Sequence, residues 1–117
     1  MSDPTPLWDP ADPVASEERL RLAADGASAQ EQLVLMTLVA RALTVQQEYD
    51  RAHAVLDDLS PTSDEVAVRI VLERGRLLAA EGRPDEARPQ LLAASQTAAA
   101  ARLDALRADA QALLSTL

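Results

Sequence analysis

Residues 66–94 constrain the fold of this chain most, because their pattern predicts two helices separated by residues that end the first helix and begin the second. The apolar residues that recur there at helical spacing are Ile70, Val71, Leu77 and Leu78. Gly82 suits the left-handed conformation that ends a helix, and Pro84 suits the first turn of the next one. Asp85 and Glu86 then place carboxylates at the positive end of the new helix. The stretch therefore predicts a hairpin of two packed helices.

The hairpin pattern occurs a second time, 35 residues earlier in the chain. Residues 49–56 align with residues 84–91 when Ala52 is laid on Ala87. At the same offset Ala40 falls on Gly75, so that each hairpin has a small residue in its first helix. A two-helix repeat of this length is typical of a helical solenoid.

The remaining helices are predicted from their ends. Asp12-Pro13 begins the first helix and Gly26 closes it. Ser28-Ala29-Gln30-Glu31 and Thr62-Ser63-Asp64-Glu65 are capping boxes that open two further helices. We expect an irregular acidic, proline-rich arm over residues 1–12. A single helical domain over residues 13–117 should follow, with repeats at approximately 30–60 and 65–95 and a capping helix to residue 117.

The end of the chain leaves two alternatives open. Residues 91–117 contain no Gly, no Pro and no obvious cap, and their apolar residues keep a near-heptad register. They form either one long helix or two helices joined by an unmarked turn near residues 98–101, and the sequence favours the second slightly.

These features resemble the tetratricopeptide repeat family, and in particular small bacterial proteins of that family. The small residue of the family's first helix corresponds to Ala40 and Gly75, and its turn glycine corresponds to Gly82. Gln47 stands in place of that glycine in the first repeat. The resemblance implies an all-α fold, a right-handed solenoid of antiparallel helix pairs with about two full repeats plus flanking helices.

The resemblance also implies a binding site, because the first helices of such repeats line a concave groove that holds a peptide or a partner helix. The positions that would line it here are Val34, Thr37, Arg41, Thr44, Arg69, Leu72, Arg76 and Ala79. Arginines in such a groove would favour carboxylates through paired hydrogen bonds. The alternative is that Arg69 pairs with Glu73 along its own helix and that the other arginines are ordinary solvated charges.

Composition limits the classes of partner. The net charge is −8, which argues against nucleic acid and against an anionic membrane, since both reward a basic surface. The absence of Cys excludes disulfides and thiolate zinc sites. Neither a signal peptide nor a membrane-spanning run is recognisable, and a cytoplasmic protein is expected.

Catalytic chemistry has little support in the sequence. Asp50, His53 and Asp57 share one face of the third predicted helix and could hold a divalent metal, but a solvated acidic face is the better interpretation. We therefore expect no catalytic residue, no metal and no cofactor.

The predicted function is a non-catalytic scaffold that binds another protein or peptide, including an acidic one. The alternative is a ligand-sensing domain that takes an acidic peptide or a small carboxylate through the arginine groove. A homodimer is also expected, through an apolar stripe on the last helix that contains Leu103, Leu106, Leu113 and Leu117.

Overall fold

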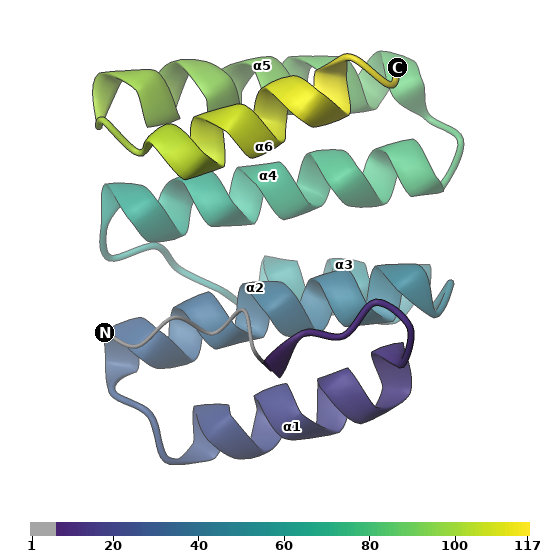
Figure 1. Cartoon of the computed structure of the whole chain (residues 1–117), viewed down its shortest axis with the longest axis vertical. Helices are drawn as coiled ribbons and strands as arrows, with labels where there is room; N and C mark the ends of the chain where they lie inside the picture. Colours follow the sequence, from purple (N-terminus) through teal and green to yellow (C-terminus); the bar gives the residue numbers. More distant parts are fainter. Residues whose placement is uncertain (1–6) are drawn as a thin grey trace. The chain divides into compact units, whose positions relative to one another are not determined.

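The structure, a computed structural model, describes residues 7–117, and every regular element in that range is a helix. The helices are α1 Pro13–Asp25, α2 Ala29–Val45, α3 Tyr49–Asp57, α4 Asp64–Ala80, α5 Pro84–Ala100 and α6 Asp104–Leu114 (Figure 1). The predicted all-α class is thus confirmed for these residues. None of these helices is both long and apolar enough to span a membrane.

The chain divides into two compact units. The N-terminal unit, described from residue 7 to residue 59, contains α1, α2 and α3, and both α1 and α3 pack against α2. The C-terminal unit, residues 60–117, contains α4, α5 and α6. There α5 packs against both α4 and α6, and α6 also contacts α4.

The two predicted hairpins repeat closely in their local structure. Both α2 and α4 have 17 residues, and their bounds lie 35 residues apart, as do the first residues of α3 and α5. The turns also match, because Gln47 and Gly82 both adopt a left-handed conformation, with φ of 63° and 76°. In each turn the amide of the residue that follows the left-handed one donates a hydrogen bond to the carbonyl five residues earlier. These bonds run from Glu48 N to Leu43 O and from Arg83 N to Leu78 O, both at 2.9 Å.

A third copy of this turn ends α5. Arg102 has a φ of 59°, and Leu103 N donates to Ala98 O at 2.8 Å. The end of the chain is therefore two helices, and the turn lies at residues 101–103, slightly after the predicted position. Neither Gln47 nor Arg102 is the glycine that this backbone conformation normally favours, which is why the sequence marks only Gly82 clearly.

One of the two predicted capping boxes is confirmed at its N-cap and the other is shifted. The Ser28 hydroxyl accepts from Glu31 N at 3.3 Å, as predicted for α2. In α4 the cap is Ser63, whose hydroxyl accepts from Val66 N at 3.2 Å. The box beginning at Thr62 was therefore wrong by one residue, because the helix begins at Asp64 and not at Ser63.

The C-terminal unit has a continuous apolar core built from α4, α5 and α6. Its buried members are Val68, Leu72, Leu91, Ala94, Ala98, Leu106 and Ala110. Gly75 permits a close approach of α4 and α5, since a Cβ built on it would lie 2.6 Å from Leu91 Cγ and Cδ2. The small residue that the repeat pattern requires here has a direct packing reason.

The leucines expected to form an exposed self-association stripe lie on the core-facing side of the C-terminal unit. Leu106 belongs to the buried core, and Leu103, Leu113 and Leu117 pack against it while partly buried. The expectation of an exposed stripe is wrong for these four side chains, because α6 turns its apolar side onto its own unit. The homodimer itself stays a prediction.

The N-terminal unit is tied together by a buried carboxylate, that of Glu17 on α1. Its oxygens accept from Arg21 Nε at 2.9 Å, Gln46 Nε2 at 3.0 Å and Arg51 Nη2 at 3.1 Å. Burial raises the pKa of the Glu17 carboxyl, but hydrogen bonds from Gln46 and Arg21 and the charges of Arg21 and Arg51 outweigh burial and lower that pKa. The ionised carboxylate links α1 to the end of α2 and to α3.

The irregular arm is described only from residue 7 onward. Asp9 N donates to the buried Ser16 hydroxyl at 2.8 Å, and that hydroxyl donates back to Asp9 O at 3.0 Å. These two bonds fix the arm to α1, and Trp8 beside them is half-buried. The part of the predicted arm before residue 7 lies outside the described residues.

Candidate functional site

Half of the predicted groove positions carry buried side chains. These are Val34, Thr37 and Thr44 on α2 and Leu72 on α4. The Thr37 hydroxyl donates to Val34 O at 2.6 Å and the Thr44 hydroxyl to Ala40 O at 2.9 Å, so both satisfy their polarity within α2. Leu72 belongs to the core of the C-terminal unit. These four side chains offer no surface to a partner, which corrects that part of the predicted groove.

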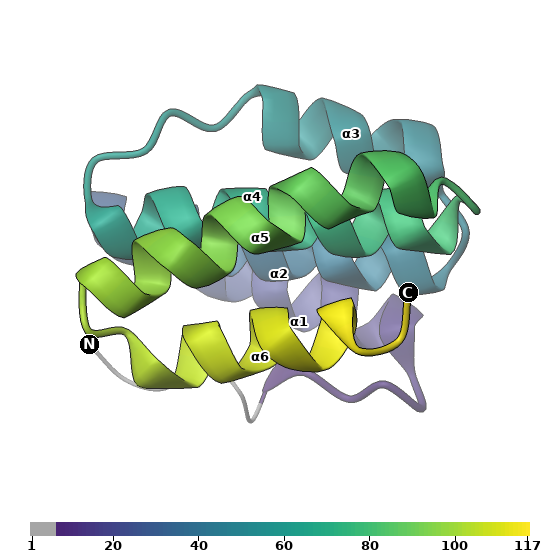
Figure 2. The ribbon, with the colours of Figure 1, turned by 90° about the horizontal axis from the view of Figure 1, so that it is seen from above.

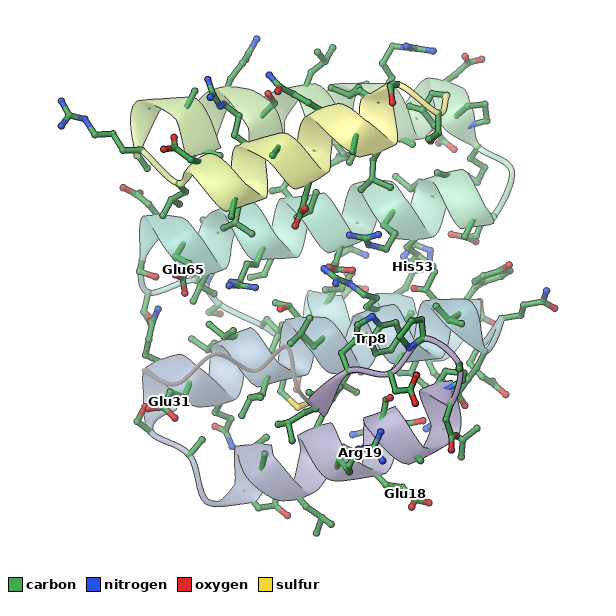
Figure 3. The ribbon with its side chains drawn as sticks, viewed as in Figure 1. Trp8, Glu18, Arg19, Glu31, His53 and Glu65 are labelled. Atoms are coloured by element: carbon green, nitrogen blue, oxygen red, sulfur yellow. The ribbon has the colours of Figure 1, made fainter. Side chains whose placement is uncertain are left out.

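The predicted arginines and Ala79 are half-buried, and the two predicted arginines that lie on α4, Arg69 and Arg76, pair with acids of the same helix. Arg76 Nε lies 3.2 Å from Oε2 of Glu73, whose side chain is only 3% exposed. Arg69 Nε lies 3.7 Å from Glu65 Oε2, and Glu65 sits in the first turn of α4 (Figure 3). Arg69 thus faces Glu65 and not Glu73, so the predicted Arg69–Glu73 pairing is wrong. Among residues 7–117, the buried Nε of Arg69 has no hydrogen-bond acceptor.

The acidic trio of α3 does not assemble a metal site. His53 lies on α3 (Figure 3), between Asp50 and Asp57 in the sequence. Within the described part of the chain, no three His, Cys, Asp or Glu side chains are gathered closely enough to hold a metal ion.

A pocket of about 520 Å³ lies in the N-terminal unit, and the sequence did not single it out. We call it the α2–α3 pocket. Its lining residues come from all three helices of the unit and from the residues just after α3, and they are Arg21, Gln32, Leu33, Met36, Ala54, Val55, Asp58 and Leu59. Five of these are apolar and three are polar, a composition common in binding pockets, which span roughly 300–1,000 Å³.

The pocket exists because α3 is short. It has 9 residues, whereas α5, which begins at the matching position, has 17. Figure 2 shows α3 giving way to an irregular connection, while α5 continues as helix. Pro61 explains the difference, because it disfavours the helical conformation at Ser60, and the matching position of the second hairpin holds Gln96.

Among residues 7–117, the shortening of α3 leaves part of α2 uncovered. In the C-terminal unit, Val68 of α4 is 1% exposed and shares a core with Ala94 and Ala98 from the second half of α5. Leu33 occupies the position of Val68 in α2, yet it is only half-buried and lines the pocket. The α2–α3 pocket therefore marks the place that two further helical turns would fill. The sequence signal that could have predicted this pocket is Pro61, which stands in the first hairpin where the second hairpin, 35 residues later, has Gln96.

No protein-family model, no curated protein and no solved structure matches the chain. The tetratricopeptide resemblance therefore stays a prediction that rests on the repeated small residues and the turn glycine, Ala40, Gly75 and Gly82.

Proposed function

We propose that this chain is a non-catalytic scaffold that binds another protein, and that the α2–α3 pocket is its docking site. The observation that carries the proposal is the half-buried apolar side of α2 at Leu33 and Met36, which lines the pocket. At the matching positions of the other hairpin, Val68 is buried and Val71 is partly buried against the core of its unit. The proposal keeps the scaffold function of a tetratricopeptide-like solenoid but places docking on a different surface.

The side chains that line the pocket support this proposal. Fully burying an exposed Leu or Met side chain contributes about 1.5–3 kcal/mol, and a partner would gain the part of this that Leu33 and Met36, already half-buried, still expose. Met36 adds adaptability, because its unbranched thioether adjusts to the shape of a partner. Arg21 and Asp58 supply one charge of each sign beside the apolar residues, which would fix the orientation of a partner.

The test is capture of a partner by the immobilised whole chain from the lysate of its source organism. Met36→Glu places a charge in the pocket, and Leu22→Glu is the matched control, since Leu22 is 73% exposed on α1 and does not line the pocket. We expect a protein that is retained by the wild type and by Leu22→Glu but lost with Met36→Glu. Circular dichroism checks that both variants stay helical. Equal retention by all three proteins would contradict docking in the pocket.

A second candidate function is the binding of an acidic ligand by α4. It is favoured by the buried Nε of Arg69, a donor that faces Glu65 at 3.7 Å and lacks a hydrogen-bond acceptor among residues 7–117. A ligand carboxylate could supply that acceptor only by displacing the atoms that cover this Nε, since the Arg69 side chain as a whole is 20% exposed. A thermal-shift screen of acidic peptides and dicarboxylates on wild type and Arg69→Gln tests this function. It fails if no acidic ligand raises the melting temperature of the wild type.

A further inference from the structure

We propose that the occupant of the α2–α3 pocket is a two-turn helical segment of the partner protein, lying on α2 as the second half of α5 lies on α4. This inference rests on the proposed scaffold function and names the class of partner that the pocket accepts.

The geometry comes from the C-terminal unit, where an equivalent surface is already filled. Leu91, Ala94 and Ala98 of α5 are spaced by three and four residues, so they lie on one face of that helix. All three are buried in one core with Val68. Because α2 and α4 have the same length and the same turn after them, a helix placed after α3 would meet α2 in the same manner.

The side chains of α2 specify small residues on the occupant. Leu33 and Met36 stand where α4 has Val68 and Val71, so α2 projects the larger side chains at both positions. Even against the smaller valines, α5 uses only alanine at its second and third contact positions. By the same offset Leu59 already stands where α5 has Ala94, so packing at constant volume requires Ala or Gly at the counterpart of Ala98 on the segment that covers Leu33 and Met36.

Charges at the pocket set the direction of the occupant. Asp58 is the C-cap of α3, it is exposed, and it lines the pocket. A helix that continues the direction of α3 would begin beside this carboxylate, which favours the positive end of a helix. Arg21 also lines the pocket; its side chain is 42% exposed and pairs with Glu17, and it would in addition face an acid of the occupant.

The probe is a synthetic peptide with the sequence of residues 90–103, which contains the half of α5 that the pocket lacks. Leu92→Lys and Gln96→Glu are joined by a lactam bridge on its solvent side, since both residues are exposed in α5. Circular dichroism first establishes that the bridged peptide is helical, because an unbridged helix of this length is marginal in water. Fluorescence anisotropy of the labelled peptide then measures its affinity for the whole chain.

We expect the peptide to bind wild type and Leu22→Glu with equal affinity, and Met36→Glu at least about tenfold more weakly. Asp58→Arg, an exposed change that leaves the core intact, should weaken binding about two- to fivefold. A second bridged peptide that carries Ala98→Arg should lose binding, because a large side chain cannot enter the helix contact.

Three results would overturn the inference. The first is a helical peptide that binds no better than its Ala98→Arg counterpart. The second is an affinity that neither Met36→Glu nor Asp58→Arg changes. The third is stabilisation of the wild type, but not of Met36→Glu, by decanoate while the peptide has no effect, which would make the pocket a site for small apolar molecules. If the lysate partner still depends on Met36 in the second or third case, the scaffold function stands and only the helical occupant is refuted.

Discussion

Replacing Gly75 by alanine tests whether the close approach of α4 and α5 is fixed by this residue. The new Cβ would lie 2.6 Å from Leu91 Cγ and Cδ2, whereas non-bonded carbons prefer about 3.5–4.0 Å. Leu91 is fully buried, so its side chain must retreat by about 1 Å into a filled core. Such overpacking costs about 1–3 kcal/mol. The higher helix propensity of alanine offsets about 1 kcal/mol of that cost.

We therefore expect Gly75→Ala to lower the free energy of unfolding by about 1 kcal/mol, which corresponds to a melting temperature lower by about 4–8 °C. Urea unfolding followed by circular dichroism at 222 nm measures the change. The matched control is Ala40→Gly at the same position of the first hairpin, which should also destabilise by about 1 kcal/mol because it loses helix propensity. Stabilisation of the protein by Gly75→Ala would refute the packing argument, because the gain in helix propensity would then exceed any cost of overpacking against Leu91.

The other stability predictions concern a buried charge, the turns and a helix cap. Glu17→Gln should lower the free energy of unfolding by about 1–3 kcal/mol at neutral pH, and this difference from wild type, measured by urea unfolding, should shrink at acid pH. The pKa of Glu17 is lower in the folded protein than in the unfolded chain. The stability that its carboxylate contributes is therefore complete at pH values above the pKa of the unfolded chain, and it is lost as the pH falls through the pKa of the folded protein. Gln47→Gly should stabilise by about 1 kcal/mol and Gly82→Ala should destabilise by a similar amount, measured as melting temperatures, because both positions require a positive φ. Ser63→Ala should cost about 1 kcal/mol in urea and more than Thr62→Ala, and the reverse order would contradict the observed cap.

The sequence carried most of the helix pattern because helix ends have strong local causes. Gly82 and Pro84 marked the central turn, and the 35-residue offset placed its counterpart at Gln47. The turn at Arg102 left no such mark, because a non-glycine residue there adopts the left-handed conformation that the closing hydrogen bond requires. The end of α5 could therefore be suspected but not located to the residue.

The candidate site was predicted less well, for a reason that lies in tertiary packing. A helical period assigns Thr37 and Leu72 to one face of their helices, but it does not say which face the rest of the chain covers. The α2–α3 pocket depends on a comparison of two hairpins, in which Pro61 stops one second helix after 9 residues while the other reaches 17. The difference in length between the two second helices decides how much of α2 stays uncovered, and no residue that lines the pocket predicts that length by itself.

The central claim is that a partner protein docks in the α2–α3 pocket, and site-specific photo-crosslinking tests it most directly. The photoreactive residue p-benzoylphenylalanine would replace Asp58, which is exposed and lines the pocket, or Leu22, which is exposed and does not line it. After illumination in the lysate of the source organism, we predict a discrete crosslinked protein from position 58 that is absent from position 22 and disappears with Met36→Glu. The same crosslinked product from both positions, or its persistence with Met36→Glu, would contradict docking in the pocket.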